Sequence, residues 1–509
     1  MDHLTKTLMV VAMLFASTMS FAEDTPSNDQ LFEMFKQSQA KMAELEARTV
    51  KAEAEAASAK AELAQLQIQS NAVSYETGTP ADQESQSGLV GTNASYSYKV
   101  LDHSIRTNAK QRYQLEAIRD GALEQKLTFG GQVTALANYQ KSNTNTKFGW
   151  LMRHPTSANQ IGESVSEAVI HSSNLAVTAR LTNNLTAYAE LLYNPEQNFA
   201  SGSTITGLPR NNVNMRRAYL MYGNLADSNF YASIGKMDIP FGWNDTVSPF
   251  TNSTSWHSFA GLAYGGLVGY AGDKLHVRAM GIQGGAQFRN ANTPVSGTNV
   301  PSKLNNFAVD ANYTFSFENQ GRLLAGASYQ YGSSYCQEYP VKHFNACKDN
   351  NDSVAVYAEY VNKKLTLIAE AAQTLEVWPG SANPNFPAYA DFAPQKNLTF
   401  TLGGKYAADF GLEQPVSLSA EFSRFESGAK GSPWEKQDQY VLGASYFPVD
   451  SVKLFAEYVH VAGWVPLNFL SGGNRDATNA FPNVPALHES WSDQDAKTDL
   501  IVIGVQAAF

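Results

Sequence analysis

The chain has 509 residues, of which 43% are hydrophobic and 17% charged, and its formal net charge is −10 at pH 7. A negative balance without a basic tract excludes the neutralisation of phosphates on which nucleic-acid binding depends, so no nucleic acid is expected as a partner. The 24 Tyr, 27 Phe and 36 Gly residues favour a large antiparallel sheet whose side chains alternate between two environments.

The first 22 residues have the pattern of a secretory signal peptide. Lys6 precedes the apolar run LMVVAMLFA, and Ser20-Phe21-Ala22 places small residues at the two positions that signal peptidase recognises. The apolar run is too short to span a bilayer, and no run of about 18 apolar residues follows it, so a helical membrane protein is not expected. The sequence therefore predicts export, with cleavage after Ala22.

A seven-residue repeat from Leu31 to Leu66 predicts a coiled coil within a periplasmic segment, residues 23–70. Apolar or small residues occupy its two seam positions, with Lys and Glu between them. A solvated single helix or a disordered linker is the alternative. We expect the coil to join copies of the chain into a homo-oligomer, with a trimer as the favoured order.

Residues 71–125 are polar and rich in Gly and Ser. This composition predicts a linker, with a short helix near Lys110–Ile118 and with the option that part of the segment enters a pore.

Alternating segments of about ten residues, typical of β-strands, fill residues 126–509. The connections between them alternate between short turns, such as Asn183-Asn184, and long polar loops. Short turns on one side and long loops on the other are typical of outer-membrane barrels, with the short turns in the periplasm. The sixteen candidate strands begin near Lys126, Glu167, Leu185, Asn214, Phe230, Leu262, Leu275, Asn305, Leu323, Ser353, Leu365, Leu398, Val416, Gln439, Val452 and Thr498. We therefore expect an all-β fold, a sixteen-stranded antiparallel transmembrane β-barrel in the outer membrane of a Gram-negative bacterium.

Charged residues of both signs fall on one face of these strands, opposite the apolar face. In LTLIAE (365–370), for example, Thr366 and Glu370 lie opposite the apolar side chains. A sixteen-stranded barrel is too wide for side chains to fill, so this face is expected to line a wet lumen. A soluble sandwich would instead bury the charges between its sheets at high cost. The predicted lumen charges are Glu190, Arg217, Arg278, Glu359, Glu370, Lys405, Glu421, Lys453 and Glu457.

Aromatic residues favour the same interpretation. Tyr222, Tyr313, Tyr406 and Tyr446 fall on the apolar face near the short turns, where an interfacial girdle against membrane lipid is expected. All seven Trp residues fall in or beside the long loops. They would either contact lipopolysaccharide at the outer rim or line a ligand vestibule.

Cys336 and Cys347 lie in one long loop, which in an exported chain predicts a loop-closing disulfide. Only His343 lies near them and no CxxC spacing is present, so no metal site is expected. No nucleophile elbow, HExxH motif, phosphate-binding glycine loop or paired-carboxylate motif is present either. We therefore expect no cofactor and no enzymatic activity.

The stretch GKMDIPFGW (235–243) leads into the third long loop, Pro240–Gly261, which is rich in Ser, Thr and Asn. A loop at this position commonly folds inward in sixteen-stranded porins and sets the constriction. A Pro/Gly bend that only ends the strand is the alternative. The constriction candidates are Lys236, Asp238, Asn244, Asp245, Trp256 and His257.

The GKxDxPFG stretch, the exported coiled-coil leader, the barrel segment 126–509 and the terminal Phe resemble the LbtU-type siderophore porins, the family of the legiobactin receptor. The resemblance covers most of the mature chain. It implies a barrel that takes up a ferric siderophore without an energised plug, and it assigns no ligand residues. The same features resemble trimeric solute-specific or general diffusion porins for phosphate, sugars or other small polar solutes, which is the alternative.

Overall fold

The computed structural model describes residues 88–105, 107–143, 163–193, 213–284, 287–288, 304–318, 320–336, 350–382, 391–463 and 495–509. The chain divides into two compact units, residues 1–86 and 87–509, and every described residue belongs to the second. The predicted signal peptide, the predicted coiled coil and residues 71–87 of the predicted linker lie outside the described residues. The coiled coil and the oligomer that it would form therefore stay predictions.

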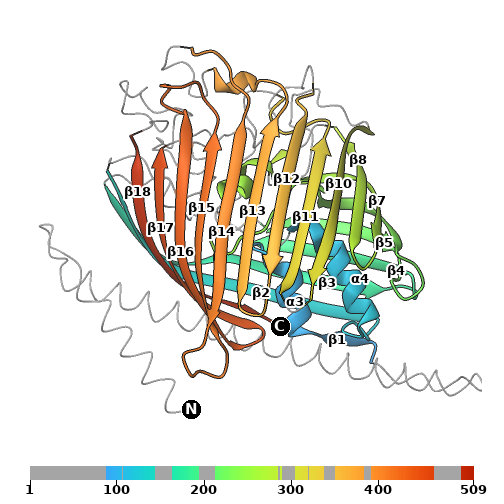
Figure 1. The fold of residues 1–509 in the computed structure, drawn as a ribbon. Coiled ribbons are helices and arrows are strands. Elements are labelled where there is room, and N and C mark those ends of the chain that lie inside the picture. The colour runs from blue at the N-terminus through green and yellow to red at the C-terminus, as the bar shows by residue number, and fades with distance from the viewer. Residues whose placement is uncertain are drawn as a thin grey trace, which may run out of the picture. The chain divides into compact units, whose positions relative to one another are not determined.

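The described strands close into an antiparallel barrel (Figure 1). The described sheet has 18 strands, of which the short strands β1 (Val90–Thr92) and β9 (Gln287–Phe288) lie outside the ring, and the other sixteen form the wall. β18 pairs with β2 and thereby closes the sheet. The wall strands are β2 (Leu127–Ser142), β3 (Ser164–Arg180), β4 (Leu185–Tyr193), β5 (Val213–Tyr222), β6 (Phe230–Asp238), β7 (Gly261–Ala271), β8 (Leu275–Gln283), β10 (Leu304–Phe317), β11 (Gly321–Gln330), β12 (Ser353–Val361), β13 (Leu365–Thr374), β14 (Leu398–Ala408), β15 (Val416–Glu426), β16 (Lys436–Val449), β17 (Val452–Gly463) and β18 (Lys497–Ala508).

The predicted sixteen-stranded antiparallel barrel is confirmed, and each wall strand begins within three residues of its predicted start. Turns such as 181–184 and 450–451 join strands at one end of the barrel, and longer connections join them at the other. In Figure 1 the short turns lie along the lower and lower-right side of the view.

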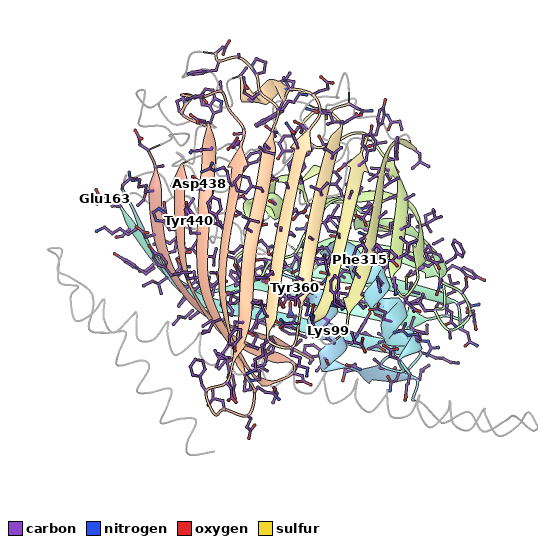
Figure 2. The ribbon with its side chains drawn as sticks, viewed as in Figure 1. Lys99, Glu163, Phe315, Tyr360, Asp438 and Tyr440 are labelled. Carbon is purple, nitrogen blue, oxygen red and sulfur yellow. The ribbon has the colours of Figure 1, made fainter. Side chains whose placement is uncertain are left out.

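The outer face of the barrel is apolar and the inner face is mostly polar. Leu402 of β14 is 56% exposed on the outer face, whereas the adjacent Thr401 is 1% exposed on the inner face. Exposed aromatic residues such as Tyr222 and Tyr406 lie near the short turns, and Figure 2 shows Phe315 and Tyr360 in the same half of the wall. A closed sheet with this outer surface is stable against lipid, because its backbone groups pair within the wall. None of the helices in the described part of the chain is long and apolar enough to cross a membrane.

The end of the predicted linker is folded rather than extended. Residues 88–123, the luminal insert, contain β1, which pairs in parallel with the start of β2, and the helices α3 (Ala94–Leu101), η2 (Thr107–Ala109) and α4 (Lys110–Arg119). The predicted helix near Lys110 is α4. The Asn93 side chain caps α3 by accepting a hydrogen bond from Tyr96 N, at 2.9 Å. Figure 1 shows both α-helices toward the short-turn end of the barrel.

The largest hydrophobic core lies inside the barrel, between the luminal insert and the inner wall. Val100, Leu115 and Leu123 of the insert are at most 1% exposed and cluster with Tyr219 of β5 and Met280 of β8. Burial of this apolar surface stabilises the insert against the wall. The insert therefore belongs to the barrel unit as a packed element.

The long loops hold the tryptophans and the cysteines. Trp243, Trp256, Trp378 and Trp434 are at most 3% exposed, so these four neither form an exposed rim nor line an open vestibule; they anchor the loops by packing. The other three tryptophans lie outside the described residues. Cys336 is disulfide-bonded, and its predicted partner, Cys347, lies outside the described residues.

Candidate functional site

The third long connection, residues 239–260 and here called loop 3, runs into the lumen. It leaves β6, contacts the inner wall on the far side of the barrel and returns to β7 through the short helix α5 (Thr254–Phe259), which contacts β13 to β16. Ser253 caps α5 by accepting a hydrogen bond from Trp256 N, at 3.1 Å. Loop 3 therefore narrows the lumen from within.

Three glutamates of the inner wall hold the first half of loop 3. Glu370 on β13 accepts a hydrogen bond from Trp243 N at 2.6 Å. Glu421 on β15 accepts hydrogen bonds from Thr246 Oγ1 at 2.6 Å and from Val247 N at 3.0 Å.

The third glutamate, Glu457 on β17, makes the largest number of these bonds. It accepts hydrogen bonds from Phe250 N at 2.6 Å, from Thr251 N at 3.0 Å and from Thr251 Oγ1 at 2.5 Å. A buried donor without an acceptor is costly, and these three glutamates accept from successive residues of the loop, so the wall fixes the path of the loop backbone.

Glycines on the intervening strands let the loop lie close to the wall. Gly403 on β14 pairs with Glu421, and Gly443 on β16 pairs with Glu457. A Cβ atom at Gly443 would lie 2.3 Å from Pro249 Cδ, and one at Gly403 would lie 2.6 Å from a methyl group of the loop. Glutamates and glycines thus alternate across β13 to β17, and we call these five positions the glutamate–glycine row.

We expect Gly443→Ala to displace loop 3, because the new methyl group would overlap the Pro249 ring. The cost of overpacking is about 1–3 kcal/mol. Thermal unfolding should therefore shift to lower temperature, and loop 3 should become more accessible to protease. Gly266→Ala is the matched control, because no atom lies closer than 4.0 Å to a Cβ at that strand position. Equal behaviour of the two variants would contradict the close approach.

Ion pairs fill the opposite part of the lumen. Arg217 of β5 donates to both carboxylate oxygens of Asp238, at 2.5 and 2.9 Å, and to Glu190 at 2.7 Å. Arg278 of β8 forms an ion pair with Asp310 of β10 at 2.6 Å. These arginines are at most 2% exposed, so the charges form a compensated network rather than an open charged surface.

The luminal insert bonds directly to loop 3. Asn108 Nδ2 donates to Phe241 O at 3.2 Å and to Gly242 O at 2.7 Å. Lys453 of β17 joins the two elements from the wall, because its ammonium group donates to Pro249 O at 2.6 Å and to Asp102 at 3.3 Å. Movement of the insert would therefore break bonds that position loop 3.

His103 forms another contact between the insert and loop 3. Its Nε2 atom lies 3.1 Å from Phe250 O, and its ring meets the Phe250 ring edge-on with centroids 5.0 Å apart. Burial lowers the pKa of His103 from 6.5 to about 3. The docked insert therefore contains the neutral imidazole.

We expect docking of the insert to weaken as pH falls below about 6.5. Below pH 6.5 the undocked His103 takes up a proton, while the docked His103 does not. The free energy that favours docking is therefore undiminished above pH 6.5 and falls by about 1.4 kcal/mol per pH unit toward the docked pKa. Burial raises the pKa of Asp102, but Lys453, His103 and Ser104 outweigh this effect and hold it below 3.8, so Asp102 contributes only at lower pH. Protease cleavage within the insert should increase between pH 6.5 and 4.5, and His103→Gln should abolish that increase. An unchanged pH profile in His103→Gln would contradict this role.

The structure distributes the six constriction candidates over several places. Asn244 and Asp245 lie at the start of loop 3, where Asn244 has φ 52° and its side chain donates to Phe241 O at 2.8 Å. Trp256 and His257 are buried on α5. Asp238 belongs to the arginine network described above.

Lys236 lies apart from the other candidates. It pairs in register with Tyr264, an exposed residue of the outer face, and its ammonium group donates to Met215 O at 2.5 Å. Two residues before it, Ile234 is 66% exposed on the outer face, and the register of β6 continues unbroken through Gly235 to Lys236. The structure therefore places Lys236 outside the lumen.

All nine predicted lumen charges lie on the inner face of the wall. Glu359 and Lys405, with Lys453, border a polar cavity of about 260 Å³ that remains in the short-turn half of the lumen. The insert, residues 245–249 of loop 3 and the wall strands β11, β12 and β14 to β17 line it. Arg322 also lines this cavity with a side chain that is 59% exposed, so the cavity meets solvent.

Sequence reasoning predicted the helix near Lys110 and left open that part of the linker enters the pore, but it missed the packing of the insert against the wall and the loop-binding role of the glutamates. The dipeptide Ala-Glu recurs at positions 369–370, 420–421 and 456–457, but it also occurs at 189–190 and 358–359, where the glutamate pairs with an arginine, so it does not identify the loop-binding glutamates. The residues of the insert give a weak signal as well, because α3 and α4 are short and mix apolar with polar residues.

No protein-family model matches the chain. No curated protein matches it either. Among solved structures, the outer membrane channel DcaP of Acinetobacter baumannii is 16% identical, with a TM-score of 0.44, and the match covers 75% of this chain and 97% of that one. OmpT of Vibrio cholerae is 11% identical with a TM-score of 0.41, covering 75% and 97% of the two chains. OprB of Pseudomonas putida is 9% identical with a TM-score of 0.45, covering 77% and 97%.

Proposed function

We propose that this chain is an outer-membrane channel for passive diffusion of small polar solutes and not an enzyme. The observation that carries the proposal is the closed sixteen-stranded barrel with an apolar outer face and a charged inner face. Such a wall is stable in lipid and surrounds a polar path. The luminal insert and loop 3 narrow this path from the short-turn side and from within.

The size of the remaining cavity favours small solutes. It measures about 260 Å³. Sites for drug-sized ligands are about 300–1,000 Å³. A monosaccharide or a small organic acid is therefore the size class that we propose, provided that the insert and loop 3 stay in place.

A ferric siderophore is the second candidate, and the sequence resemblance to siderophore porins motivates it. Siderophore complexes are large, so their passage would require displacement of the insert, loop 3 or both. Growth on ferric siderophores under iron limitation distinguishes the candidates. We expect a strain lacking this chain to grow normally on them, and a growth defect restored by the gene would favour siderophore uptake.

Liposome swelling tests the proposed size class. Purified protein in liposomes should admit monosaccharides rapidly and trisaccharides much more slowly, because the cavity excludes the larger solutes. Gly266→Ala, which changes the wall without adding a close contact, should give the wild-type profile. Equal rates for both sizes would contradict the narrow path, and no swelling with any solute would contradict the channel itself.

A further inference from the structure

We infer that the cavity in the short-turn half of the lumen is a binding subsite for a small solute that carries a single carboxylate group. Lys405 would bind the carboxylate, and the hydroxyl groups of Ser248 and Ser419 would complete its hydrogen bonds. This inference rests on the proposed function, because it names the solute class of the same path.

Hydroxyl groups and aromatic rings both line the cavity. Its lining includes Ser417, Ser419 and Ser445 from the wall, and the rings of Tyr98 and Phe447. Binding sites for small molecules typically combine apolar surface with a few placed polar groups. This lining fits a compact solute with one charged end and hydroxyl groups.

Lys405 can bind an anion, because the other bases of the cavity already lie next to carboxylates. Among the bases of the cavity, Lys453 lies 3.3 Å from Asp102, and Arg322 lies 3.7 Å from Glu359. Within the described part of the chain, no carboxylate forms an ion pair with Lys405. Its ammonium group can therefore compensate one additional negative charge.

Two hydroxyl groups in the same lining lack hydrogen-bond partners. Ser248 on loop 3 is only 4% exposed, and its Oγ atom has no partner among the described residues. Ser419 on β15 is the cross-strand neighbour of Lys405, and its buried Oγ atom lacks a partner in the described structure as well. A buried hydroxyl without a partner is costly, and an oxyanion that accepts from both would relieve that cost.

The charges around Lys405 select a monoanion. Asp245 faces the same cavity from loop 3, so a second negative charge on the solute would be repelled. A neutral sugar would fit the hydroxyl groups but would leave the ammonium group uncompensated. A hydroxylated monocarboxylate satisfies both the cation and the hydroxyl groups.

Titration calorimetry on the folded protein in detergent, with gluconate as the probe, tests this inference without depending on conduction. We expect gluconate to bind, and we expect glucose, which lacks the carboxylate, and phosphate, which carries more charge at pH 7.5, to bind at least about tenfold more weakly. Lys405→Met should weaken gluconate binding about tenfold or more, whereas Lys405→Arg should retain most of it. Lys364→Met, in an exposed short turn, is the matched control and should bind as the wild type does.

Absence of gluconate binding to the wild type, or equal binding by wild type and Lys405→Met, would overturn the inference. Ser248→Ala combined with Ser419→Ala provides a second test that leaves the charge intact, and it should also weaken binding. If the protein conducts ions but does not bind gluconate, only this inference is overturned. If the protein binds gluconate but does not conduct ions, the proposed function is overturned instead.

Discussion

Glu457→Ala is expected to release loop 3 from the barrel wall and to raise single-channel conductance. The substitution leaves the amides of Phe250 and Thr251 and the Thr251 hydroxyl without their acceptor. Each unsatisfied buried group costs about 1–3 kcal/mol, and water in the lumen recovers part of this cost. A net loss of about 3 kcal/mol would raise the population of the detached loop more than a hundredfold. Planar-bilayer recordings should show larger and noisier current steps.

Glu457→Gln distinguishes loop release from loss of charge. The amide oxygen of glutamine can still accept from the loop amides, so conductance should stay near the wild-type value. Glu413→Ala removes an exposed carboxylate in a short turn and serves as the control for net charge. If Glu457→Ala folds and conducts as Glu413→Ala does, the glutamate–glycine row does not hold the constriction.

Deletion of residues 88–121 is expected to produce the largest increase in conductance. It removes α3, which contacts β2 and β18, and α4, whose Leu115 lies in the main hydrophobic core, and with them the Asn108 bonds to loop 3. It also exposes apolar wall residues such as Tyr219 to water, so thermal stability should fall because that burial is lost. Conductance and the unfolding temperature measure the two effects on one preparation.

A point substitution covers the case in which the deletion variant does not fold. Leu115→Asp places a carboxylate at a position that is 0% exposed inside the main hydrophobic core and should undock the insert. Arg119→Ala, on the exposed side of the same helix, is the matched control. Wild-type conductance in a folded Leu115→Asp variant would show that the insert does not narrow the path.

The sequence alone predicts the wall far better than what fills it. Strand periodicity repeats over sixteen segments, and a slip of one residue would turn lipid-facing residues such as Leu402 and Ile503 into the lumen, so the register is strongly specified. The luminal insert has no such periodicity. Its place depends on long-range contacts, for example Tyr98 with Gln506 and Asn108 with Gly242, which local pattern cannot reveal.

In the candidate site, the sequence predicts which face the charged residues occupy but not what they bind. The inner-face charges are predictable because alternation fixes their direction, as for Lys405 and Glu457. Their roles are not predictable in this way, since Glu457 binds Phe250 of loop 3, which lies 207 residues earlier in the sequence. Lys236 departs from its expected place although the register of β6 is unbroken, because strict alternation from the exposed residues Phe230 and Ile234 already places its side chain on the outer face.

Single-channel conductance in planar bilayers tests most directly whether the lumen is a water-filled path narrowed by the insert and loop 3. Wild-type protein should give stable unit steps, and both the 88–121 deletion and Glu457→Ala should give larger steps under the same salt and voltage. Folded protein that produces no steps, or the same step size in all three proteins, would contradict this arrangement.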